Sequence, residues 1–303
     1  MLGIAIINYK QPQKTIDCIN SIFKTVNADY KIYLLDNNSA DNSAEILENE
    51  YKNENRVEFF KSDTNTGYAN GNNLCLEKAK KDGCDYILIS NNDIIFDENT
   101  VDTLLDEIQS TDCLAIAPVL KAPNGTRMQN IKKSSPDFKR YMLSETYLRN
   151  FDRKRKYQNT YLPKKFEEVY WISGAVFIAD MKKFETIGFF DKNTFLYYEE
   201  FIISEKAVKK GYTLAIEPAV CVYHYHGASS GGNANLFTRL ENLKSELYFL
   251  SNYKKYPNSK LRKVRFIRCL EVLFTFTKEH KLKDALKYIK ESKKVLKVNK
   301  NEN

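Results

Sequence analysis

The sequence contains no long apolar run and no cysteine pattern that would build a disulfide or zinc framework. No apolar stretch approaches the roughly 18 residues that a membrane-spanning helix needs, and the apolar segment at residues 1–7 is too short for a signal peptide. The six cysteines show no CxxC spacing, and most lie in apolar segments, where a free thiol behaves as a small hydrophobic side chain. The sequence therefore predicts a cytoplasmic protein in a reducing compartment, or one held peripherally at the inner face of the cell membrane.

Histidine and tryptophan are scarce, with three residues and one residue. Two of the histidines, His224 and His226, fall together in front of a Gly/Ser-rich turn. This concentration favours a metal ligand, with His224 preferred over His226, although a polar residue at a strand end is the simpler alternative. Trp171 is expected either to pack in the core or to stack against a bound ligand.

The first 250 residues have no net positive charge, because their acidic residues slightly outnumber the basic ones, and the excess of positive charge lies at the end of the chain. Residues 251–303 hold about 16 Lys and Arg and about 5 Asp and Glu, so the formal net charge of +8 belongs to this tail. We therefore expect residues 231–303 to form a basic helical extension that binds an anionic membrane surface, mediates homo-oligomer contacts, or is simply solvated. No nucleic-acid motif is present, so nucleic acid is not an expected partner. Helical spacing predicts two apolar faces, one with Leu261, Val264, Ile267, Leu270 and Phe274, the other with Leu282, Leu286, Ile289 and Leu296.

The first third of the chain alternates strand and helix patterns. The first strand is a continuous apolar run, typical of a strand buried on both faces, and a proline then suits the first turn of a helix. This order predicts an α/β fold with a doubly wound sheet. The expected strands are 2–8, 31–36, 57–60 and 86–90, followed in the second half by a strand region at 168–179, helices at 180–187 and 199–210, and a strand pair within 213–223 that Pro218 interrupts. Residues 121–167 are expected to form loops or short helices.

Polar residues stand at or after the ends of the first four strands: Asn8, Asp36, Asn65 and Asp93. Ligands of such sheets bind at the carboxyl ends of the strands, so these residues predict a nucleotide-sized site at this edge. Glycines in the third loop would let the backbone approach a ligand closely, although a plain loop is the alternative. The candidate donor-binding residues are Asn8, Tyr9, Asp36, Asn38, Asn65, Gly67, Gly71, Asn72, Asn91 and Asn92.

An ordered set of motifs over about residues 4–230 resembles the family 2 inverting glycosyltransferases of the GT-A fold, in the branch that builds bacterial surface polysaccharides. The resemblance implies a GT-A-like mixed sheet flanked by helices over residues 1–230. It also implies a nucleotide-sugar donor, UDP- or dTDP-linked, and a saccharide or lipid-linked saccharide acceptor. The matching segments are Ile7-Asn-Tyr9, Leu35-Asp-Asn-Asn-Ser39, Asn65-Thr-Gly-Tyr-Ala-Asn-Gly-Asn72, Asn91-Asn-Asp93, Ser173-Gly174, Gly188-Phe-Phe-Asp191, Tyr198-Glu-Glu200, Lys210-Gly-Tyr212 and His224-Tyr-His-Gly-Ala-Ser229.

The resemblance implies a role for particular positions. Asp36 would bond the donor base, although it could instead cap the next turn. Asp93 and His224 would bind Mn²⁺ or Mg²⁺ beside the diphosphate, since carboxylate and phosphate oxygens suit these cations. Glu200 would be the catalytic base, and its neighbour Glu199 would orient it or replace it in that role.

The chain departs from the family pattern around the base. Glu200 stands where the family usually has Asp, apolar Phe201-Ile-Ile203 follows, and Lys206 stands where Arg is common. The acceptor site, for which Trp171 and Gly174 are the candidates, is therefore expected to differ in shape.

Two other functions remain open from the sequence. One is a nucleotide-sugar-binding or scaffold protein with impaired catalysis, because the base motif is altered. The other is a nucleotidyltransferase, which would want a Gly-rich basic loop after the first strand, and residues 8–12 lack one. Each candidate acid also has a structural alternative. Asp93 could be a strand-end carboxylate that caps the following helix, and the two glutamates could be acids that favour a helix N-terminus.

Overall fold

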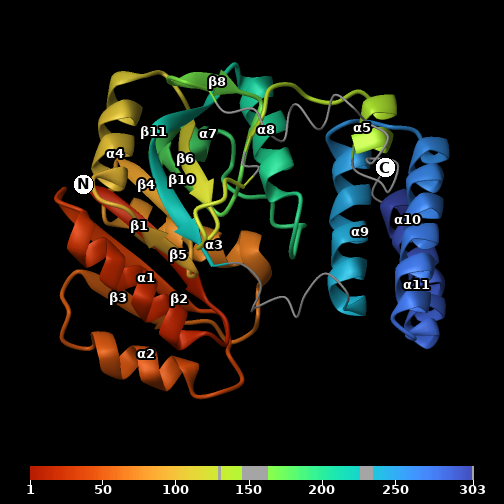
Figure 1. Cartoon of the computed structure of the whole chain (residues 1–303), viewed down its shortest axis with the longest axis horizontal. Helices are drawn as coiled ribbons and strands as arrows, with labels where there is room; N and C mark the ends of the chain where they lie inside the picture. The colour runs from red at the N-terminus through yellow and green to blue at the C-terminus, as the bar shows by residue number, and fades with distance from the viewer. Residues whose placement is uncertain (129–130, 145–162, 226–234, 302–303) are drawn as a thin grey trace.

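The computed structural model describes residues 1–128, 131–144, 163–225 and 235–301 (Figure 1). Within these ranges nine strands form one sheet in the order β3-β2-β1-β4-β10-β6-β11-β5, and β8 pairs with β11. A two-stranded ribbon joins β7 (Ile131–Lys132) to β9 (Trp171–Ile172). The strands of the sheet are β1 (Leu2–Asn8), β2 (Tyr30–Asp36), β3 (Val57–Lys61), β4 (Tyr86–Asn91), β5 (Ile94–Phe96), β6 (Ala115–Lys121), β8 (Glu167–Val169), β10 (Val176–Asp180) and β11 (Leu214–His224).

The sheet is mixed, as predicted. Strands β1 to β4 run parallel to one another, β10 is antiparallel to β4 and β6, and β11 is parallel to β6. The prediction of a strand pair at 213–223 is wrong, because β11 is one strand. Pro118 and Pro218 cannot donate to a ladder, and the β11–β6 register shifts between Glu217 and Cys221. The expected strand region at 168–179 is likewise divided, into β8, β9 and β10.

Helices cover both faces of the sheet (Figure 1). One buried cluster joins the sheet to α1 (Pro12–Thr25), α2 (Ser43–Tyr51) and α4 (Thr100–Ser110). The cluster on the other face includes side chains from α3 (Gly67–Lys81), α7 (Met181–Thr186) and α8 (Glu199–Lys210). All six cysteines are free and five are buried, as expected for small core side chains.

The region after residue 235 is helical, as predicted, and packs beside α8 (Figure 1). It consists of α9 (Leu236–Asn252), α10 (Asn258–Lys278) and α11 (Leu282–Asn301), and α5 (Phe138–Ser144) lies against the same cluster. The α8 residues Phe201 and Ile202 belong to this cluster, so α8 joins the sheet to the helical extension. The proposed boundary near residue 230 lies outside the described residues. No helix in the described ranges is long and apolar enough to cross a membrane.

The predicted apolar faces of α10 and α11 are wrong in part. Leu261 and Val264 are buried, but Leu270, Phe274 and Leu286 are exposed. These helices carry more apolar residues than one contact face can bury, so their spacing could not show which stripe meets α9. The stripe that the structure buries consists of Leu261, Val264, Cys269, Val272 and Phe276 on α10, and of Ala285, Tyr288 and Val295 on α11.

Candidate active site

The head of α8 carries the two adjacent glutamates on a strained turn. Tyr197 and Tyr198 both have positive φ values, 73° and 70°, directly before Glu199. Two consecutive bulky residues in this region are rare, and each costs on the order of 1–3 kcal/mol that the surrounding packing must offset. The ring of Tyr198 stacks on Phe201 at 5.3 Å between centroids. This packing fixes the turn and with it the position of both carboxyl groups.

Glu200 is held by the backbone of Gly174. The Gly174 N–H donates to Glu200 Oε1 at 3.2 Å, and the Tyr68 hydroxyl donates to the Gly174 carbonyl at 2.5 Å. A Cβ at position 174 would stand 2.9 Å from Glu200 Cγ and Oε1, so the position requires glycine. Burial raises the pKa of Glu200, while the Gly174 N–H and the Lys132 charge oppose this shift. Gly174 was predicted to touch the acceptor, and the structure places it against the candidate base.

Glu199 is 4% exposed, and its Oε1 has no hydrogen-bond partner among the described residues. Burial, and then the charge of Glu200, raise the pKa of Glu199 to about 8. Two carboxyl groups this close cannot both ionise readily, so a neutral Glu199 leaves the negative charge on Glu200. The pair therefore provides one carboxylate that can accept a proton near neutral pH.

Asp93 and His224 meet at the end of the sheet. His224 ends β11 and pairs with Ile94 of β5, and Asp93 directly precedes β5. The Tyr225 N–H donates to the Asp93 carbonyl at 2.9 Å. Asp93 Oδ1 stands 3.0 Å from His224 Nε2, with side-chain exposures of 11% and 4%. Asp93 and His224 were predicted to bind the same cation. Their contact is compatible with that role, which stays a prediction.

The donor atoms of this pair fit a divalent cation. A carboxylate oxygen and an imidazole nitrogen suit Mn²⁺ or Mg²⁺, and no well-formed hydrogen bond from the described residues reaches Asp93 Oδ1. Across the described ranges no cluster of three or more His, Cys, Asp or Glu side chains is present. A cation here would thus take its remaining ligands from substrate or water. His226 lies outside the described residues.

The ends of β1 and β2 form a polar network. Asn8 Nδ2 donates to Asp36 Oδ2 at 2.8 Å, and the Ser39 N–H donates to Asp36 Oδ1 at 2.9 Å. Asp36 is 1% exposed, so it orders this loop, and its contact with a donor base stays a prediction. Asn37 was missed by the sequence reasoning. Its Oδ1 accepts from the N–H and the hydroxyl of Thr66 at 3.0 and 2.9 Å, joining the second loop to the third.

The glycines of the third loop approach protein rather than open space. Gly67 has φ +77°, and a Cβ there would stand 2.3 Å from the Phe195 carbonyl oxygen. A Cβ on Gly71 would stand 2.8 Å from Ile7 Cδ1. These contacts give both glycines a structural reason, and their contact with a donor stays a prediction. Gly67 lets the loop meet the segment before α8, and Gly71 lets α3 pack closely on the sheet.

The remaining donor candidates differ in exposure. Asn72 is 1% exposed and bonds within α3, while Asn38 is exposed and adopts φ 59°. Asn92 Nδ2 donates to Thr15 Oγ1 at 2.9 Å, which ties the end of β4 to α1. Donor contacts by partly exposed Tyr9, Asn65 and Asn91 stay predictions.

Glu200, the candidate base, and the Asp93–His224 pair are linked through neighbouring segments of the chain, residues 174–175 and 91–93. The Asn91 N–H, two residues before Asp93, donates to the carbonyl of Ala175 at 2.8 Å. Ala175 follows Gly174, which holds Glu200. Trp171 is partly exposed, and its indole Nε1 is buried without a hydrogen-bond partner in the described part of the chain. Its ring lies 5.7 Å from that of Phe201, beside the helix that carries the base.

Comparisons with known proteins bear on the family and the fold. The sequence model of glycosyl transferase family 2 matches residues 3–175. Glycosyltransferase GlyG of Streptococcus pneumoniae serotype 4 is 29% identical over 112 residues, which is 37% of this chain and 36% of that protein's length. N-acetylglucosaminyl-diphospho-decaprenol L-rhamnosyltransferase of Mycobacterium tuberculosis is 23% identical over 213 residues, covering 66% of this chain and 68% of that protein.

Solved structures share the fold at low identity. GalNAc-T7 superposes with a TM-score of 0.62 at 15% identity, covering 84% of this chain and 49% of that one. TarS of S. aureus gives 0.54 at 16% identity, with coverages of 91% and 73%. Because the family model matches more than half of the sequence, the chain belongs to glycosyl transferase family 2, and it has a GT-A fold.

Proposed function

We propose that this protein transfers a sugar from a nucleoside-diphosphate donor to a hydroxyl group of a saccharide or lipid-linked acceptor, with inversion of the anomeric configuration. The observation that carries the proposal is the position of the Glu200 carboxyl group at the head of α8, beside a second, buried carboxyl group. Glu200 is fixed by the Gly174 N–H, and its neighbour Glu199 is held neutral by burial. A hydroxyl is a poor nucleophile, so a positioned carboxylate that takes its proton is what the reaction requires.

One base and one displacement step lead to inversion. Glu200 accepts the proton of the acceptor hydroxyl as the hydroxyl oxygen bonds to the anomeric carbon and the diphosphate leaves from the opposite face. No carboxylate of the described site is proposed as a nucleophile, since Glu199 is buried and neutral. The fixed backbone contact of Glu200 means that little reorganisation is needed when the acceptor arrives.

We propose that Asp93 and His224 hold Mn²⁺ or Mg²⁺ against the donor diphosphate. When bound, the cation neutralises the charge that develops on the leaving diphosphate. His224 must be uncharged to act as a ligand, so cation binding would weaken at low pH. The structures of GalNAc-T7 and of the mannosyltransferase PcManGT from Pyrobaculum calidifontis both contain Mn²⁺, which supports the proposal.

We propose a uridine- or thymidine-diphosphate sugar as donor and a role in surface-polysaccharide synthesis. TarS was solved with UDP-GlcNAc and GalNAc-T7 with UDP, and the mycobacterial relative is named for a lipid-diphosphate acceptor. These proteins support the substrate class without naming the sugar. The polar edge built by Asn8, Asp36 and Asn37 is where the nucleoside would lie.

The test is metal-dependent release of nucleoside diphosphate from a panel of nucleotide sugars. We expect Glu200→Gln to lower turnover by about 10²–10⁴-fold, the usual contribution of a general base, with donor affinity almost unchanged. Glu199→Gln is the matched control and should cost less, because glutamine resembles the neutral carboxyl. Native turnover in Glu200→Gln, or a product with the donor's configuration, would refute the mechanism. Donor binding without any release would instead indicate a binding protein with impaired catalysis.

A further inference from the structure

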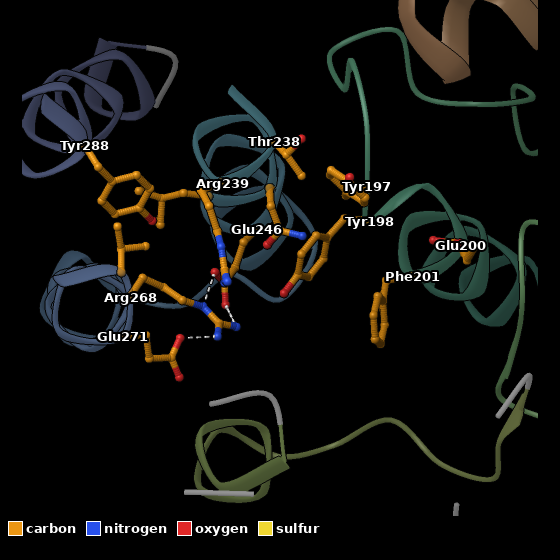
Figure 2. A pocket seen from close by; sticks show the side chains of 13 residues that line it. Tyr197, Tyr198, Glu200, Phe201, Thr238, Arg239, Glu246, Arg268, Glu271 and Tyr288 are labelled. Carbon is orange, nitrogen blue, oxygen red and sulfur yellow. Dashed lines mark hydrogen bonds and ion pairs between the residues drawn. The ribbon is translucent and has the colours of Figure 1, made fainter. Parts of the chain in front are cut away.

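A cavity of about 400 Å³ lies between the head of α8 and the C-terminal helices (Figure 2). Tyr197, Tyr198, Glu200 and Phe201 line one side of it, and side chains of α9, α10 and α11 line the other. This volume is within the range of small-molecule sites. The motif Tyr198-Glu-Glu200 contributes to one wall, while the helices that complete the cavity lie beyond residues 3–175, which match the family model.

Arg239 brings a positive charge into the cavity from α9. Its Nε is buried, and neither a hydrogen bond nor a carboxylate partner reaches its guanidinium from the described residues. The residue as a whole is partly exposed, so Arg239 presents to the cavity a cation with which an oxyanion can pair. Burial raises the pKa of Tyr288 across the cavity, and the charges of Arg268 and Arg239 oppose that shift, which places the Arg239 charge near this ring.

The other arginine of the cavity is neutralised. Arg268 Nε donates to Glu246 Oε2 and Arg268 Nη2 donates to Glu246 Oε1, both at 2.9 Å. Arg268 Nη1 donates to Glu271 Oε2 at 2.8 Å. This arrangement uses both carboxylates of the far wall (Figure 2). Arg239 is thus the cation of the cavity that has no acidic partner in the described part of the chain.

The same face of α9 carries further groups that suit an anion. Thr238 and Asn242, a hydroxyl and an amide, line the cavity next to Arg239. In the view of Figure 2, Tyr197 and Tyr198 lie between Arg239 and Glu200. An anion on Arg239 would therefore lie across two aromatic rings from the carboxylate proposed to deprotonate the acceptor.

We propose that this cavity binds a phosphate ester of the acceptor, with Arg239 as the anion-binding residue and the acceptor hydroxyl directed toward Glu200. The inference rests on the proposed function, because it assigns the anion to the acceptor rather than to the donor. A lipid-linked and a soluble sugar phosphate share this chemistry. In either case the helical extension contributes to the substrate site.

Calorimetry in EDTA, with no divalent cation to recruit phosphate to the donor site, tests the proposal. Inorganic phosphate, octyl phosphate and glucose 1-phosphate are titrated into the full chain. We expect Arg239→Gln to weaken phosphate binding by about 10-fold or more, the loss of a charged hydrogen bond. Arg262→Gln, which removes the same charge from an exposed site on α10, is the matched control and should bind as the wild type does.

The two ester probes distinguish the sources. Tighter binding of octyl phosphate than of inorganic phosphate would support a lipid-linked acceptor, and tighter binding of glucose 1-phosphate would support a soluble one. Equal affinity in the wild type and Arg239→Gln, or no binding of any probe to the wild type, would overturn the proposal. Asp93→Ala separates it from the proposed function. If phosphate binding depends on Asp93 and not on Arg239, the probe is in the donor site and the inference fails alone.

Discussion

Substitution of Gly174 by alanine should impair catalysis without touching the donor site. A Cβ at this position would stand 2.9 Å from Glu200 Cγ and Oε1 and 3.1 Å from its Cδ, closer than ordinary van der Waals contact. No positive φ value is recorded for Gly174, so alanine brings no backbone strain of its own. The carboxylate must therefore move away from the Gly174 N–H, and the main effect is on the placement of the base.

The magnitude follows from that displacement. A shift of about 1 Å in a catalytic group can cost about 100-fold in rate, and removal of a general base costs about 10²–10⁴-fold. We expect Gly174→Ala to lower kcat by about 100-fold, with an overpacking cost of about 1–3 kcal/mol in the free energy of unfolding. Donor affinity should stay near native. Release of nucleoside diphosphate measures the rate, and urea unfolding measures the stability.

A double-mutant cycle gives the sharpest test. If Gly174→Ala acts through Glu200, it should cost little further activity in a Glu200→Gln background, because the proton acceptor is already absent. Additive losses would show that Gly174 acts elsewhere, for example by contacting the acceptor as the sequence suggested. Near-native kcat in the single variant Gly174→Ala would refute the reasoning from the contact distances.

The metal pair, the buried Glu199 and the exposed face of α10 lead to three other expected results. Asp93→Ala and His224→Ala should each weaken Mn²⁺-dependent binding of nucleoside diphosphate by about 10-fold or more, and unchanged affinity by calorimetry would contradict the metal assignment. Because Glu199 has a folded pKa of about 8 against 4.5 for an ordinary glutamate, the folded state holds its proton more tightly, and the free energy of unfolding should fall as pH rises between these values. Glu199→Gln should flatten that slope in urea unfolding, and an unchanged slope would count against the shift. Phe266 and Phe274 are 61% and 65% exposed on a basic helix, so their joint replacement by serine should reduce sedimentation with anionic vesicles. Equal sedimentation would remove the membrane role, and light scattering would then test a homo-oligomer.

The sequence was sufficient for the elements whose patterns are local. The apolar run 2–8 and the helical spacing after Pro12 predicted β1 and α1, because burial on two faces and helical periodicity are recorded in neighbouring residues. The start of α8 at Glu199 was also predicted, since acids favour a helix N-terminus. The ordered motifs identified the family because each motif is also a short run of neighbouring residues.

The contacts that bring these elements together were decided only by the tertiary structure. Periodicity could not choose between the stripes of α10, because the choice depends on where α9 and α11 pack. Gly174 gave no sign in the sequence that it holds Glu200, 26 residues away. Arg239 was one cation among many in a basic tail. Its place in the cavity beside α8 follows from the packing of α9 near α8, a long-range arrangement that no local pattern records.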